Sequence, residues 1–172
     1  IGLCATAGAR LLGATTIIAV DGNDHRLGIA QKMGADVTLN FKNCDVIDEI
    51  MKITGGRGAD SAIEALGTQA TFESALRSIK PGGTLSSLGV YSEDLKIPLS
   101  AFAAGLGDHK INTALCPGGK ERMRRLMNVL ASNRLDLGLL VTHQYKLDDI
   151  VAAYDLFAHQ RDGVLKVAIK PQ

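Results

Sequence analysis

The sequence predicts an α/β fold with a doubly wound parallel sheet, and three observations support this prediction. Short apolar, β-branched runs alternate with segments of helical spacing along most of the 172-residue chain. The helical segments are about 10–13 residues long, a typical length for crossovers between parallel strands. Glycines follow several of these segments and end them. Such crossovers are right-handed and place helices on both faces of the sheet.

The elements can be assigned in order from this alternation. Helical spacing marks residues 1–13, 23–34, 45–56 and 68–79. Strand patterns mark "TTIIAV", "DVTLN", "ADSAIEAL", the run after the turn "KPGG", and "KINTALC". The run "TTIIAV" is continuous and β-branched, which is typical of a strand buried on both faces. Thr68 is the expected N-cap of the fourth helix, whose apolar face contains Phe72, Leu76 and Ile79.

The pattern changes after the "CPGG" turn. A basic amphipathic helix is expected over residues 119–135, a second helix over 148–160 and a closing strand over 164–171. We therefore expect a first domain over residues 1–116 and part of a second domain over 117–172.

Composition excludes several function classes. The net charge of +1 gives no electrostatic basis for binding nucleic acid, and the basic run between Lys120 and Arg125 is expected to be a solvated helix face. No apolar run reaches the roughly 20 residues that a membrane span needs. Residues 1–14 lack the basic leader of a signal peptide. The three cysteines, without metal-ligand spacing, are expected to be reduced thiols in the cytoplasm.

An acidic residue at the end of "TTIIAV" is the first candidate for a site. Doubly wound sheets bind ligands at the carboxyl ends of their strands. Asp21 lies there, close to the roughly 20-residue offset at which dinucleotide-binding folds place an acid on the adenosine ribose. A carboxylate accepts hydrogen bonds from both ribose hydroxyls and repels a 2′-phosphate. The alternative is that Asp21 only caps the helix that follows.

The glycine pattern that accompanies such an acid, G-x-G-x-x-G, is absent. Gly2 stands where its last glycine would fall, so we expect the first strand and the other glycines of the fold to lie before Ile1. A strand-end acid and the turn "KPGG" are also typical of Rossmann-type methyltransferases, whose acid holds the ribose of S-adenosylmethionine. These residues alone leave both enzyme classes open.

Longer stretches resemble the zinc-containing, medium-chain alcohol dehydrogenases. The matching segments are "GADSAIEALG", "IKPGGTLSSLGV", "TALCPGGKERMRRL", "LVTHQYKLDDIVAAYDLF" and "GVLKVAIKP". The resemblance covers essentially the whole chain. The segment "PGGKERMRRL" is especially similar to bacterial and protist secondary-alcohol dehydrogenases. The final segments are foreign to methyltransferases, so the resemblance favours a Rossmann-type cofactor-binding domain followed by the returning part of a catalytic domain.

The resemblance implies specific cofactor contacts. Gly2 matches the last glycine of the dinucleotide loop, and Ile1 matches the aliphatic residue behind the nicotinamide ring. Asp21 matches the acid that selects NAD, and Arg26 matches a basic residue beside the adenosine ribose. Leu66 matches a residue along the adenosine and ribose path.

Further contacts are implied later in the chain. Leu115 and Cys116 fall near a backbone contact to the carboxamide, and Lys166 matches a basic residue that reaches the pyrophosphate. The strand end that meets the nicotinamide side through its backbone contains Leu88, Gly89 and Val90.

The expected cofactor is NAD. In NADP-using members similar to "PGGKERMRRL", the position of Asp21 is a glycine followed by serine and arginine. Here Gly22 and Asn23 follow the acid instead. The sequence departs from the NADP-using pattern at that point.

The resemblance implies reversible hydride transfer between an alcohol and NAD, giving an aldehyde or ketone. A polyol dehydrogenase resembling sorbitol dehydrogenase and a zinc-free relative of the quinone reductases are alternatives, as is a nucleotide-binding fragment without catalysis. In this family the zinc ligands and proton relay precede the first Rossmann strand, so no catalytic residue or metal ligand is expected in residues 1–172. A homodimer or homotetramer is expected through the edge strand near residues 110–116.

Overall fold

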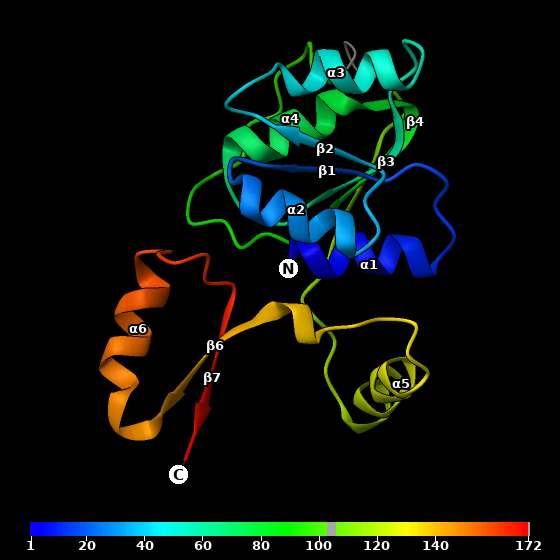
Figure 1. The fold of residues 1–172 in the computed structure, drawn as a ribbon. Coiled ribbons are helices and arrows are strands. Elements are labelled where there is room, and N and C mark those ends of the chain that lie inside the picture. Colours follow the sequence, from blue (N-terminus) through cyan, green and yellow to red (C-terminus); the bar gives the residue numbers. More distant parts are fainter. Residues whose placement is uncertain (103–105, 172) are drawn as a thin grey trace. The chain divides into compact units, whose positions relative to one another are not determined.

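The computed structural model describes residues 1–102 and 106–171. The chain divides into two compact units, Ile1–Gly119 and Lys120–Gln172. Figure 1 shows the path of the chain through both. This division lies close to the one after residue 116 that the sequence suggests, and each unit is described by itself below.

The first unit alternates helices and strands in the order that the sequence predicts. Its elements are α1 (Gly2–Leu11), β1 (Ile18–Asp21), α2 (Asp24–Lys32), β2 (Val37–Asn40), α3 (Val46–Ile53), β3 (Ala59–Glu64), α4 (Gln69–Ser78), β4 (Ile79–Ser87) and β5 (Lys110–Thr113). The predicted α/β class is confirmed. The sequence expectation of a turn at "KPGG" differs from the structure, because this stretch lies inside β4, where the register against β3 shifts between Ala59 and Ser61.

All strand pairs of this unit are parallel, as expected, but they form two sheets. One contains β1 and β2, with Ile18 opposite Val37, and the other has the order β3-β4-β5. In Figure 1, β1 and β2 run in the same direction, and α2 starts on the side at which β1 ends. Within the described residues, β1 pairs only with β2 and β3 only with β4. Both strands therefore have one unpaired edge.

The expectation that the run "TTIIAV" is buried on both faces is wrong, because β1 has an unpaired edge. Val20, in the middle of β1, is 43% exposed. Ile63 in β3 is exposed as well. Each of these two strands has a neighbouring strand on only one side, so its apolar side chains are incompletely covered.

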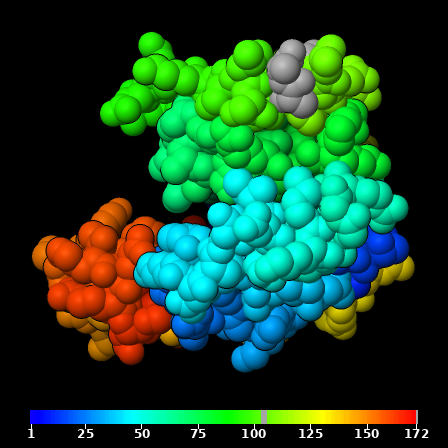
Figure 2. Space-filling model, turned by 90° about the horizontal axis from the view of Figure 1, so that it is seen from above, coloured from blue at the N-terminus to red at the C-terminus, as the bar shows by residue number. Residues whose placement is uncertain are grey.

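The larger core lies between α4 and the β3-β4-β5 sheet. Phe72, Leu76 and Ile79 are all buried there, as their helical spacing predicts, together with Leu85 of β4 and Ala101. A smaller core joins Ile17, Ala30 and Ala35 beneath α2. Figure 2 shows the cyan atoms around α3 in contact with the green atoms of the following segment, in agreement with the packing of α3 on α4.

Side-chain caps fix the starts of three helices. The Thr68 hydroxyl accepts a hydrogen bond from the backbone N–H of Thr71, which confirms Thr68 as the cap of α4. Asp45 caps α3 in the same way. Asn23 caps α2, and its side chain accepts from the N–H groups of His25 and Arg26. These bonds satisfy N–H groups that the first turn of a helix leaves without partners.

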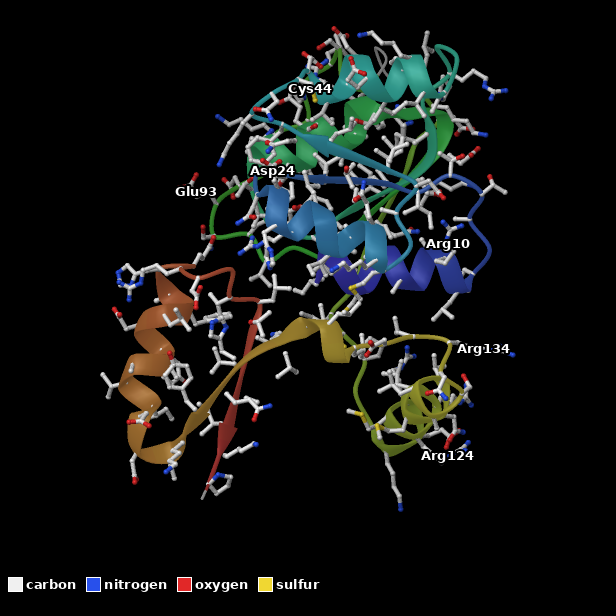
Figure 3. The ribbon with its side chains drawn as sticks, in the orientation of Figure 1. Arg10, Asp24, Cys44, Glu93, Arg124 and Arg134 are labelled. Carbon is white, nitrogen blue, oxygen red and sulfur yellow. The ribbon has the colours of Figure 1, made fainter. Side chains whose placement is uncertain are left out.

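The second unit contains two helices and a parallel strand pair. Its elements are α5 (Lys120–Ala131), the short 3-10 helix Gly138–Leu140, β6 (Val141–Lys146), the 3-10 helix Leu147–Asp149, α6 (Ile150–Ala158) and β7 (Lys166–Lys170). The sequence analysis missed β6, which pairs with the predicted strand β7. On α5, Glu121 forms ion pairs with Arg124 and Arg125, so the basic run is a solvated, internally paired face. Figure 3 labels Arg124 on this helix.

Within the part of the chain that the structure describes, no helix is both long and apolar enough to cross a membrane.

Candidate functional site

The end of β1 presents a carboxylate, as the sequence predicts. Asp21 is the last residue of β1 and is half-buried. Its Oδ1 accepts a hydrogen bond of 3.0 Å from the backbone N–H of Asn23. Its other oxygen accepts no hydrogen bond from the described residues. Since Asn23 is the cap of α2, the alternative role of Asp21 as that cap is wrong.

The residue after Asp21 has little room for a side chain. A Cβ placed on Gly22 would lie 2.5 Å from the ring of Phe41, which follows β2. Phe41 itself is exposed and its ring is the far end of a flexible side chain. A side chain at position 22 would therefore require the Phe41 ring to move.

The first turn of α1 is open. Gly2 is its first residue, and a Cβ placed there would meet no atom within 4 Å. Ile1 gives no side-chain cap, and the first turn contains no acidic residue. The leading N–H groups of a helix have no partner within the helix and attract anions such as phosphate.

A second strand-end acid, Glu64, closes β3 and is only 3% exposed. Its Oε1 accepts hydrogen bonds from the N–H groups of Leu66 and Gly67, at 2.7 and 2.8 Å, and from the Thr71 hydroxyl at 2.8 Å. Its Oε2 accepts a bond of 2.6 Å from the Tyr91 hydroxyl. This carboxylate links the turn after β3 to the segment after β4.

The electrostatics of this pair are consistent with an ionised acid and a neutral phenol. Burial by itself raises the pKa of Glu64, but the hydrogen bonds from Tyr91, the two backbone N–H groups and Thr71 outweigh it and leave that pKa below its ordinary value. Burial and the neighbouring Glu64 raise the pKa of Tyr91 to about 12. Tyr91 therefore remains a hydrogen-bond donor at neutral pH.

Glycines bring the two strand ends into close contact. Gly67 has φ +99°, in the left-handed region, and a Cβ there would overlap the backbone of Val90. A Cβ on Gly89 would overlap both the Glu64 carboxylate and the Cα of Gly67. The absence of side chains at these two positions therefore lets the backbones after β3 and β4 pack directly against each other.

The structure brings together some of the predicted site residues. Leu66 lies in the turn after β3, beside residues 88–90 after β4, and the Leu88 N–H donates to the Glu64 carbonyl at 2.8 Å. Arg26 lies half-buried in the first turn of α2, next to the Asn23 cap. Leu115 and Cys116 are exposed beyond the end of β5. Lys166 is the first residue of β7 and belongs to the second unit.

A cavity of about 400 Å³ lies away from these strand ends. It is bounded by α2, β2 and the loop before α3, including Asp24, Asn40 and Cys44. Figure 3 labels Asp24 and Cys44 on either side of this region. The Asn40 amide donates to the Asp24 carboxylate at 2.6 Å across this lining. None of the residues expected to contact a cofactor lines this cavity.

Sequence reasoning missed Glu64 and Tyr91. Glu64 could have been identified from the sequence, because an acid ends the strand pattern "ADSAIE" much as Asp21 follows "TTIIAV". Tyr91 carries no comparable signal, because its contact with Glu64 joins residues 27 positions apart.

The described residues do not form a metal centre. Within residues 1–102 and 106–171 there is no group of three or more histidine, cysteine, aspartate or glutamate side chains that could hold a metal ion. The ring nitrogens of His143 lie within hydrogen-bond distance of the Thr142 hydroxyl and the Asp162 carboxylate. A zinc ion therefore does not fit this set of residues, and no chemical step is derived through one.

Comparisons with known proteins show the family of this chain. The model of the zinc-binding dehydrogenase family matches residues 1–132. An alcohol dehydrogenase of Cupriavidus necator is 84% identical over 99% of this chain and 47% of its own length. The NADP-dependent isopropanol dehydrogenase of Clostridium beijerinckii is 36% identical over 98% of this chain and 49% of its own length.

A solved structure shows the same fold. The zinc-dependent alcohol dehydrogenase 2 of Streptococcus pneumonia superposes with a TM-score of 0.86 and 32% identity, covering 98% of this chain and 48% of that protein. The chain thus spans about half the length of the relatives that it matches. The family match covers most of the chain, and on this ground the chain belongs to the zinc-binding dehydrogenase family.

Proposed function

We propose that this chain is the cofactor-binding part of an NAD-dependent alcohol dehydrogenase. The whole enzyme would transfer hydride reversibly between an alcohol and NAD, giving an aldehyde or ketone. The observation that carries the proposal is Asp21, whose half-buried carboxylate ends β1 with one oxygen free of bonds from the described residues. The alcohol dehydrogenases similar to this chain supply the reaction class.

Different residues of the chain would contact different parts of the dinucleotide. Asp21 would accept hydrogen bonds from the two hydroxyls of the adenosine ribose, and its charge would repel a 2′-phosphate. The open first turn of α1, beginning at Gly2, would bind the pyrophosphate. The backbone of residues 88–90 would orient the nicotinamide, and Leu66 would border the ribose path. When bound, NAD supplies the carbon that accepts the hydride.

Specificity for NAD is part of this proposal. The related isopropanol dehydrogenase uses NADP. In this chain Gly22, Asn23 and Asp24 follow Asp21, so no basic side chain directly follows the acid. Placing a 2′-phosphate beside Asp21 would bring two negative charges together in a half-buried position, which is unfavourable.

Zinc, the alcohol and self-association complete the proposed enzyme. Zinc and its ligands would belong to residues outside this sequence. The strands β1 and β3 each offer an unpaired edge to a further parallel strand, which would join the two sheets into one.

We also propose that the enzyme forms a homodimer or homotetramer through β5. A cytoplasmic location is in keeping with the free cysteines Cys4, Cys44 and Cys116.

Binding of reduced cofactors to the 172-residue chain tests the proposal. Fluorescence titration with NADH and NADPH should show weak but preferential binding of NADH. Asp21→Asn should lower this preference by roughly tenfold, the equivalent of one strong hydrogen bond. Asp48→Asn, a change of an exposed acid on α3, serves as the matched control. Equal binding of NADH and NADPH to the unchanged chain would contradict the NAD assignment.

A further inference from the structure

Glu64 is a buried acid that the proposed function does not use. It is 3% exposed, and its carboxylate accepts from two backbone N–H groups and from the hydroxyls of Thr71 and Tyr91. The Ser87 hydroxyl lies between Tyr91 and the acid, 2.6 Å from the Tyr91 oxygen. Both carboxylate oxygens therefore accept hydrogen bonds from groups of the protein.

A charge buried this deeply needs a structural reason. An isolated carboxylate in a protein interior is strongly unfavourable, so it persists only where hydrogen bonds replace its water. Here the replacing donors come from two separate stretches of chain, residues 66–71 and residues 87–91. The acid therefore holds these stretches together, because both are bonded to the same carboxylate.

Both stretches contain residues that we propose to line the cofactor. Leu66 lies in one, and residues 88–90 lie in the other. The two stretches lie in direct backbone contact, because a side chain at Gly67 or Gly89 would overlap the opposite stretch. The ring of Tyr91 is fixed as well, since it packs edge-to-face on Phe72 with ring centroids 6.1 Å apart.

We propose that Glu64 and Tyr91 are positioning residues that hold the segment after β4 where it meets the nicotinamide half of the cofactor. Neither touches the cofactor. Glu64 holds both strand ends, whereas Tyr91 holds only the one after β4. This inference rests on the proposed function for its ligand, but the mechanical link between the two residues stands on the structure alone.

The two residues can be separated by substitution. Tyr91→Phe removes one hydroxyl and keeps the ring on Phe72. Glu64→Ala removes the acceptor for both stretches. Ser78→Ala is the matched control: Ser78 is equally buried, but its hydroxyl bonds the Ser74 carbonyl within α4, at the end of that helix away from Thr68. Circular dichroism establishes which variants fold.

Amide hydrogen exchange of the chain without cofactor is the first measurement. Tyr91→Phe should speed exchange in residues 87–91 by roughly tenfold, the equivalent of one lost hydrogen bond. Glu64→Ala should speed it in residues 65–68 as well. Ser78→Ala should leave both segments unchanged. If Tyr91→Phe and the control give the same exchange in residues 87–91, the positioning role is wrong, and this outcome decides the matter even where Glu64→Ala fails to fold.

Ligand affinity is the second measurement. NADH and ADP-ribose share every group except the nicotinamide, so Tyr91→Phe should weaken NADH by roughly tenfold and leave ADP-ribose within about twofold. Equal weakening of both ligands would show a general loss of structure and overturn the proposal. Absence of binding of either ligand to the unchanged chain would contradict the proposed function instead, while the exchange experiment would still decide the link between Glu64 and Tyr91.

Discussion

The backbone N–H of Asn23 donates a 3.0 Å hydrogen bond to the Asp21 carboxylate, and the side chain of Asn23 caps α2. Two neighbouring polar residues thus have separate tasks. Asn23 starts the helix, and one oxygen of Asp21 accepts no hydrogen bond from the described residues.

Cofactor preference should move toward NADP when the strand end is rebuilt. Asp21→Gly removes the repelling charge, and Asn23→Arg adds a guanidinium for the 2′-phosphate. The ratio of the NADPH to NADH dissociation constants should fall by at least roughly tenfold in the double variant. Asn23→Arg alone should change the ratio less. An unchanged ratio in the double variant would remove Asp21 from the ribose site.

The change of Asn23 to arginine should also lower the free energy of unfolding. Asn23→Arg removes the cap of α2, so the free energy of unfolding should fall by about 1 kcal/mol. Asn23→Asp keeps an acceptor at this position and should change stability little. Urea titrations of the two variants give the comparison. Equal stability of the two would mean that the cap contributes nothing.

Acid should destabilise the first unit through Glu64. The folded pKa of this acid lies below its ordinary value of 4.5 because its hydrogen bonds favour the ionised form. Its contribution is therefore present above the ordinary pKa and is lost as the pH falls through the lower folded pKa. Unfolding free energies measured from pH 7 downward should decline less steeply below pH 4.5 for Glu64→Gln than for the unchanged chain. Parallel declines would exclude this role for the buried acid.

Self-association through β5 should be sensitive to charge. β5 pairs with β4 on one side, and Asn112 on this strand is exposed. Two copies joined edge to edge would place their Asn112→Lys side chains near each other, and the repulsion should shift the equilibrium toward monomer. Sedimentation velocity measures this shift, with the exposed Asn43→Lys as control. A dimer unaffected by Asn112→Lys would have another interface.

The larger core should be sensitive to truncation. Leu85 of β4 is fully buried, so Leu85→Ala should lower the free energy of unfolding by about 2–5 kcal/mol. Leu12 is 91% exposed, and Leu12→Ala should change it by less than about 0.5 kcal/mol. Thermal unfolding of both variants provides the test. A small effect at Leu85 would place the core elsewhere.

Local patterns predicted most of the fold. Alternating runs located every strand of the first unit, and the spacing of Phe72, Leu76 and Ile79 identified the buried face of α4. The cap at Thr68 was readable because it depends on residues three apart. The strand β6 was missed because its exposed, polar residues "VTHQYK" lack the continuous apolar character of the others.

Long-range pairing set the limit of prediction. The exposure of Val20 depends on which strands are neighbours, and no local pattern specifies that. Asp21 could be identified as a candidate because its position relative to Gly2 is local. The hydrogen bond between Glu64 and Tyr91 forms only when two strand ends meet, so no local pattern predicted it.

The unpaired edges of β1 and β3 have a practical consequence for handling the isolated chain. Each presents a row of backbone donors and acceptors beside partly exposed apolar residues such as Val20 and Ile63. Edges of this kind recruit strands from other molecules and lead to aggregation. A synthetic peptide strand supplied in excess would compete with this aggregation. The rate at which the protein aggregates in the presence of different peptides would then show which peptide sequences complete the sheet.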